Sequence, residues 1–145
     1  MILFNDKFKL TEKYLEKTFD ACNTIYFNNE LIKIPILLTE DNSANGYFKF
    51  DIDFKNRLLN NPRIEISNKH RSKFVDLEQT MLHEMIHYKV FMELSGEEIN
   101  DAFSAYEAKN TELFNRLLYL GDFAHINKWQ EYKNSINNKY KMNIR

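Results

Sequence analysis

The sequence of 145 residues has little of what builds loop-rich or disulfide-linked proteins: one cysteine, Cys22, three glycines and two prolines. A single cysteine excludes a disulfide within the chain and also excludes a cysteine-rich zinc ribbon. So little glycine and proline favours long regular elements over a fold made mainly of loops. The default setting for such a chain is a reducing one, so we expect a cytoplasmic protein.

Long apolar runs are also missing. No segment approaches the roughly 20 apolar residues that cross a bilayer, and the start, MILFNDKFKL, is charged by Asp6, unlike a secretory signal. Hydrophobic residues still make up 43% of the chain and aromatic residues 14%, enough to bury a core. We therefore expect one domain over residues 1–145, a monomer, and no membrane association.

Charge is nearly balanced, at −1 overall, but it is unevenly distributed. Between Lys55 and Lys73 there are six basic residues and one acidic residue, Glu65. Such a stretch could follow the phosphates of DNA, although on charge alone an ordinary solvated surface is the favoured interpretation. The basic residues are Lys55, Arg57, Arg63, Lys69, Arg71 and Lys73, and His70 lies among them.

Apolar periodicity predicts a helix, three strands, and then helices to the end, an order typical of an α+β fold. The expected first helix runs from Thr11, its N-cap, to Asn28. The strands are expected at Ile34–Thr39, Gly46–Phe54 and Arg63–Ser67, with a turn in NRLLNNP before the third.

The later helices are predicted from spacing and caps. One helix is expected from Asp76 to Leu94, with Gly96 as its C-terminal stop. Helix, continuous or interrupted, should extend to Gly121, and Asp122 should cap a last helix.

Two of the four histidines, His83 and His87, lie one helical turn apart in the segment HEMIH. Two imidazoles at this spacing project in parallel, so both can reach one zinc ion. Glu84 is then held beside the metal, where it can accept a proton from water. A chance pattern on a solvated helix is the alternative. It arises in roughly one shuffled sequence in a hundred, so the spacing favours a metal site.

The chain resembles the SprT-like (Spartan-like) metalloproteases. The likeness spans about residues 10–95 and is carried, in order, by YFNNEL, IKIPILL, ANGYFKFD, RIEIS and LEQTMLHEMIHY. It implies a small zincin-like domain, a zinc cofactor, and proteolysis of DNA-associated or DNA-crosslinked proteins. The third histidine ligand of that family is absent, however. Two possible registers put Asn110 or Ile99 in its place, and the family's C-terminal zinc ribbon is missing too.

Glu107, in the segment YEAKN, is the preferred third ligand, because a carboxylate can complete a His₂Glu zinc site. The segment also faintly resembles the Glu-Ala-Asn ligand segment of ImmA/IrrE-like peptidases. A solvated helix residue is the alternative interpretation of Glu107. The competing ligands are Asp101, Asn110, Glu112 and His125, of which His125 is interpreted as a surface or packing histidine.

The sequence thus predicts a zinc metallopeptidase with His83, His87 and Glu107 as ligands and Glu84 as catalytic base. Its substrate is expected to be a protein that pairs as an extended strand with residues 46–54, so that cleavage is only loosely sequence-specific. Tyr106 and His125 are candidate oxyanion donors. Two alternatives stay open: an ImmA/IrrE-like regulatory peptidase with one dedicated substrate, and a non-catalytic zinc- or DNA-binding module.

Overall fold

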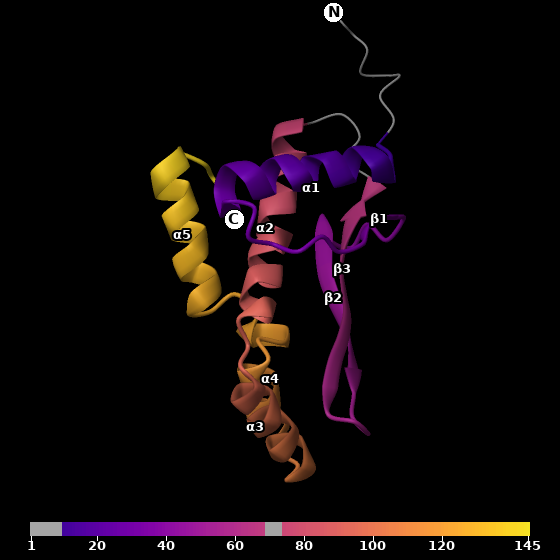
Figure 1. Cartoon of the computed structure of the whole chain (residues 1–145), viewed down its shortest axis with the longest axis vertical. Coiled ribbons are helices and arrows are strands. Elements are labelled where there is room, and N and C mark those ends of the chain that lie inside the picture. The colour runs from indigo at the N-terminus through magenta and orange to yellow at the C-terminus, as the bar shows by residue number, and fades with distance from the viewer. Residues whose placement is uncertain (1–9, 69–73) are drawn as a thin grey trace, which may run out of the picture.

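The computed structural model describes residues 10–68 and 74–145, and it shows a helix, a three-stranded sheet and then helices (Figure 1). This confirms the expected α+β class. The elements are α1 (Glu12–Phe27), β1 (Ile36–Thr39), β2 (Gly46–Asp53), β3 (Leu58–Ser67), α2 (Phe74–Met92), α3 (Gly96–Glu107), α4 (Thr111–Leu117), the 3₁₀ helix η3 (Gly121–Phe123) and α5 (Lys128–Tyr140).

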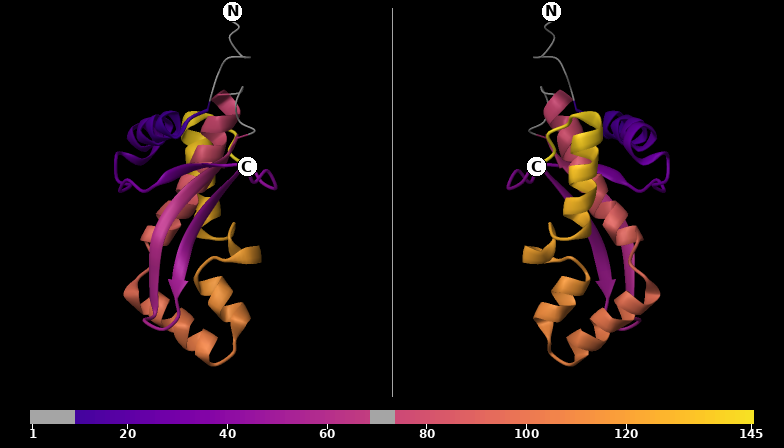
Figure 2. Two further views of the ribbon diagram at one scale, coloured as in Figure 1. Left: turned by 90° about the vertical axis from the view of Figure 1, so that its right-hand side faces the viewer. Right: turned by 90° about the vertical axis from the view of Figure 1, so that its left-hand side faces the viewer.

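The sheet has the order β1-β3-β2, so β2 is an edge strand. The central strand β3 pairs parallel to β1 and antiparallel to β2. Only the last part of β3 pairs with β1, from Ile64 to Ser67. The rest of the β2–β3 hairpin extends beyond β1 toward α3 and α4 (Figures 1 and 2).

Helix α2 lies between the sheet and α5, and α1 crosses one end of it (Figures 1 and 2). The apolar stripe expected on this helix is buried as predicted, with Leu82, Ile86 and Val90 between 0% and 4% exposed. Because both sides of α2 are covered, its polar side chains are held within packed surroundings. No helix in residues 10–68 and 74–145 is long and apolar enough to span a bilayer.

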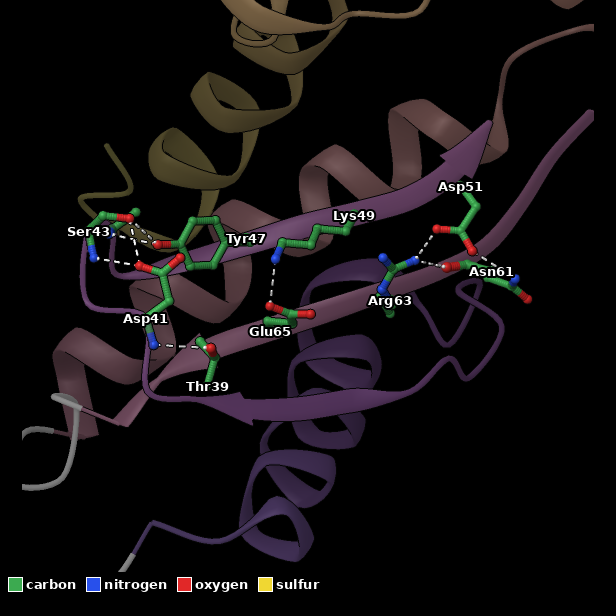
Figure 3. A network of polar contacts seen from close by, with 10 residues as sticks. Thr39, Asp41, Ser43, Tyr47, Lys49, Asp51, Asn61, Arg63 and Glu65 are labelled. Atoms are coloured by element: carbon green, nitrogen blue, oxygen red, sulfur yellow. Dashed lines mark hydrogen bonds and ion pairs between the residues drawn. The ribbon is translucent and has the colours of Figure 1, made fainter. Parts of the chain in front are cut away.

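The face of the β2–β3 hairpin that points away from α2 is polar (Figure 3). There Lys49 pairs with Glu65 at 2.9 Å, and Arg63 pairs with Asp51 at 3.0 Å. Strand alternation accounts for this face, because Phe48, next to Lys49, contacts α2 through Phe91. The predicted half-buried strand at residues 46–54 is therefore present as β2.

Strand β3 is longer than expected, because residues 58–62, predicted as a turn, continue its pairing with β2. The actual turn precedes Leu58, where Arg57 has a left-handed φ of 57°. Pro62, which cannot donate a ladder hydrogen bond, lies at a register shift of the β2–β3 pairing. The turn-forming residues of NNP therefore mark a β-bulge and not the end of a strand.

Two helix boundaries also differ from the prediction. Gly96 begins α3 and does not terminate α2, because Ser95 and Glu98 form a reciprocal capping box at the start of α3. Asp122 lies inside η3, and α5 starts only after Asn127. The helical region expected after Gly96 is divided, as the prediction allowed, between Glu107 and Thr111, where Asn110 caps α4.

Gly46 and Gly96 form a matched pair for testing how closely β2 packs on α2. A Cβ at Gly46 would lie 2.9 Å from Thr80 Cγ2 and 3.3 Å from Glu84 Cγ, whereas a Cβ at Gly96 meets nothing within 4 Å. We expect Gly46→Ala to lower the free energy of unfolding by about 1–3 kcal/mol through overpacking. Gly96→Ala should be neutral or stabilising by up to ~1 kcal/mol. Urea unfolding measures both, and equal effects would contradict the close approach.

Candidate metal centre

Three histidines converge on one point beside α2. His83 and His87 come from successive turns of this helix, and their Nε2 atoms are 3.3 Å apart. His125 comes from the turn between η3 and α5, and its Nε2 atom lies 3.0 Å from that of His83 and 3.1 Å from that of His87. All three imidazoles thus direct the same ring nitrogen toward a common centre.

The spacing of these nitrogens fits one metal ion. In a tetrahedral zinc site with Zn–N bonds of about 2.0–2.1 Å, two ligand nitrogens are about 3.3–3.4 Å apart. The observed separations of 3.0–3.3 Å are close to this value. Three protein ligands would also leave a fourth position for water or substrate, as catalytic zinc sites require.

The electrostatics favour the neutral imidazoles that a metal binds. Burial, reinforced by the neighbouring histidines, lowers the pKa of His83 to about 4 and that of His87 to about 3. Burial also lowers the pKa of His125, although this side chain is more exposed. The three lone pairs are therefore free of protons at neutral pH, where a divalent cation can use them.

The surroundings orient the three imidazoles. The Nδ1 atom of His83 lies 3.1 Å from the main-chain oxygen of Arg145, a contact that favours a proton on Nδ1 and leaves the lone pair on Nε2. Trp129 of α5 is 1% exposed, and its ring centroid lies 4.6–5.3 Å from those of all three histidines. Its indole N–H also donates to the carbonyl of His83 at 3.3 Å. Trp129 thus connects α5 to the histidine cluster.

Glu84 lies next to the cluster without belonging to it. It is 5% exposed, and burial raises the pKa of its carboxyl group to about 8. Among the described residues, the group that could hold a metal contains the three histidines and not Glu84. The role of Glu84 as a catalytic base stays a prediction.

The structure places His125, and not the preferred third ligand Glu107, beside His83 and His87. Glu107 ends α3, which leads away from α2 toward the tip of the β2–β3 hairpin (Figure 1). There its carboxylate accepts hydrogen bonds of 3.0 and 3.1 Å from Arg57 Nη1. The ion pair with Arg57 holds the carboxylate at the hairpin turn. The chain after η3 returns to α2, and this return places His125 next to His83 and His87.

The other candidates also have different surroundings. Asn110 accepts the amide hydrogen of Leu113 as the N-cap of α4, and Glu112 pairs with Arg116 at 3.2 Å. Tyr106, a candidate oxyanion donor, stacks on Phe54 with ring centroids 4.4 Å apart. The remaining candidates, Asp101 and Ile99, lie on α3, and His70 lies outside the described residues.

The scarcity of histidine was the signal that could have identified His125. The chain has four histidines, and outside the HEMIH pair only His70 and His125 could supply a third imidazole. Trp129, the only tryptophan, lies at the start of α5, shortly after His125, and carried no comparable signal in the sequence.

No family model, curated protein or solved structure matches the chain. The resemblance to SprT-like proteases therefore rests on the sequence segments, to which the structure adds a cluster of His83, His87 and His125 consistent with an HExxH-type zincin site.

Metal titration of single-residue variants tests the ligand set. We expect the wild-type chain to bind about one zinc ion, and His83→Ala, His87→Ala and His125→Ala each to weaken binding by at least about 10²-fold, because each removes a donor. Glu107→Ala is the matched control and should bind like the wild type. Chelator competition measures all four affinities. Loss of zinc in Glu107→Ala with retention in His125→Ala would reverse the assignment.

The raised pKa of Glu84 predicts a pH-dependent stability of the metal-free protein. Because its pKa rises from 4.5 to about 8 on folding, protonated Glu84 stabilises the fold fully below pH 4.5, and this contribution disappears as the pH rises through about 8. The stability of wild type relative to Glu84→Gln should therefore fall between pH 4.5 and 8. Chemical unfolding of both proteins in chelator, across this range, gives the difference, and a constant difference would contradict the buried carboxyl.

Proposed function

We propose that the protein is a zinc-dependent peptidase of the HExxH type. The observation that carries this proposal is the convergence of three histidine Nε2 atoms, 3.0–3.3 Å apart. Two of these histidines lie on α2, the helix that also bears the buried Glu84. Three neutral imidazoles and one adjacent carboxyl group match the composition of catalytic zinc sites more closely than that of structural sites, which have four protein ligands.

His83, His87 and His125 would hold the metal. A zinc ion in this position would polarise a scissile carbonyl group and make water acidic enough to ionise near neutral pH. Glu84 would take the proton of the attacking water and deliver it to the leaving amine. A nearby cation favours the charged form of a carboxyl group, so zinc would lower the raised pKa of Glu84 and let it act as a base near neutral pH.

Strand β2 supports the proposed binding of an extended peptide. It pairs with β3 on one side, and no other strand in the described part of the chain pairs with its second edge. Gly46, the first residue of β2, contacts the stem of Glu84 closely enough that an added Cβ would lie 3.3 Å from Cγ. A peptide added to this edge would therefore run past α2, the helix that bears Glu84.

DNA binding through the basic stretch stays a prediction. Arg57 and Arg63 form ion pairs with Glu107 and Asp51, which offset their charge locally. Lys69, Arg71 and Lys73 lie outside the described residues. Comparing hydrolysis with and without DNA would separate a DNA-dependent protease from a regulatory peptidase with one dedicated protein substrate.

The substitution Glu84→Gln tests the proposed reaction. It keeps the size of the side chain and removes the proton acceptor, so zinc should stay bound while hydrolysis of an unfolded protein such as casein falls by at least about 10²-fold. Glu97→Gln, at an exposed position of α3, is the matched control and should hydrolyse like wild type. Zinc content and hydrolysis are measured on the same samples. Undiminished hydrolysis by Glu84→Gln would exclude this mechanism.

A further inference from the structure

After α5 the chain turns back toward α2. Lys141, the C-cap of α5, has a left-handed φ of 56°, and its amide donates to the carbonyl of Asn137, so the chain reverses direction there. Residues 141–145 are called the return segment below. The segment ends beside α2, where the main-chain oxygen of Arg145 lies 3.1 Å from Nδ1 of His83 (Figures 1 and 2).

One side chain of α5 holds the return segment in place. The side-chain nitrogen of Asn137 donates to the carbonyl of Ile144 at 3.1 Å, and its side-chain oxygen accepts the amide hydrogen of Ile144 at 2.8 Å. The side chain of Ile144 is 2% exposed and belongs to the main core. Polar and apolar contacts together therefore fix the main chain at the residue before Arg145, whose oxygen faces His83.

The oxygen of Arg145 bears on which ring nitrogen of His83 carries the proton. A neutral imidazole has one N–H group and one lone pair, so an acceptor beside Nδ1 favours the tautomer with its lone pair on Nε2. Nε2 of His83 is the atom that lies 3.3 Å from Nε2 of His87 and 3.0 Å from Nε2 of His125. A metal ion bound at this point needs that lone pair. The return segment therefore supports the form of His83 that can bind a metal.

We propose that Asn137 is a positioning residue of the metal centre. By holding the return segment against α2, it keeps a hydrogen-bond acceptor at Nδ1 of His83 and raises metal affinity without contacting the metal. This inference rests on the proposed function only in taking His83 as a metal ligand. Trp129 at the start of α5 and Asn137 in its last turn then act on the same site, so both ends of this helix support the histidines.

Two adjacent asparagines of α5 provide matched variants. Asn137 binds the main chain of Ile144, whereas Asn138 is exposed. We expect Asn137→Ala to weaken zinc binding by about 10–100-fold, the usual effect of losing a partner that orients a metal-binding histidine. Asn138→Ala should bind zinc like the wild type. Chelator competition on the full chain gives the affinities, and wild-type affinity in a folded Asn137→Ala protein would overturn the proposal.

A pair of variants with equal charge serves if Asn137→Ala does not fold. Asn137→Asp keeps the acceptor for the amide of Ile144 but loses the donor to its carbonyl. Asn138→Asp adds the same charge at the exposed neighbouring position. Asn137→Asp should therefore bind zinc several-fold more weakly than Asn138→Asp. Equal affinities of these two proteins would overturn the proposal.

The tautomer of His83 distinguishes positioning from a general effect on stability. Long-range proton–nitrogen NMR correlation of the metal-free protein at neutral pH shows which ring nitrogen is protonated. We expect a proton on Nδ1 in the wild type and a larger share of Nε2–H in Asn137→Ala. Ile136→Val, which trims a buried side chain of the same helix, is the stability control. It should lower the melting temperature while leaving the tautomer and the zinc affinity unchanged.

The outcomes separate this role from core packing and from the proposed reaction. Weaker zinc binding by Asn137→Ala with an unchanged tautomer, or an equal loss of affinity in Ile136→Val, would show a structural role only and overturn the proposal. Weaker binding with a changed tautomer, in a protein that hydrolyses no peptide, would support the role of Asn137 and refute the peptidase activity. Hydrolysis by a folded Asn137→Ala protein with wild-type zinc affinity would refute the role of Asn137 alone.

Discussion

The packing of Trp129 between α5 and α2 is the contact on which the candidate site depends. Its buried indole touches the rings of His83, His87 and His125 and donates a hydrogen bond to the carbonyl of His83. Two of those histidines are set by the helical repeat of α2, but the third lies in a turn with no regular structure of its own. Its position relative to α2 therefore follows from how α5 docks.

A second contact brings the sheet to the same helix from the other side. At Gly46, β2 approaches Thr80 and Glu84 so closely that a methyl group would overlap with Thr80. The helix is thus positioned by α5 on the face of the histidines and by β2 near the carboxyl group. Burial from both sides also accounts for the electrostatics, because the same loss of solvent lowers the pKa of His83 and His87 and raises that of Glu84.

The sequence predicted the parts of this site that depend on local periodicity. The spacing of His83 and His87 on a helix, and the alternation along β2, are properties of a few consecutive residues. The third imidazole depends instead on how the chain turns after α3. Positive φ angles occur there at Lys109 (63°), Tyr119 (57°), Gly121 (59°) and Asn127 (49°). Left-handed backbone is usually marked by glycine. Only Gly121 carries that mark, so the sequence showed one end of the helical region and not the other turns.

The preference for Glu107 assumed a helix that returns along α2. If α3 had returned along α2, its last turn would have carried a carboxylate toward His87. Instead α3 follows the β2–β3 hairpin, which is longer than the sequence suggested because β3 starts at Leu58. The extra length of β3 puts Arg57 beside Glu107, and the two side chains form an ion pair. The carboxylate is therefore paired at the hairpin turn and does not reach the histidines.

The β2–β3 hairpin also shapes the surroundings of His87. Because β2 continues past the metal centre, Phe48 and Phe50 reach Phe91 near the C-terminal end of α2, one turn beyond His87. An apolar wall then stands directly beside an imidazole that faces the other two histidines. His87 therefore lies between the packed aromatic side chains of β2 and α2 and the two other histidines, so the orientation of its imidazole depends on the packing of β2 as well as on that of α5.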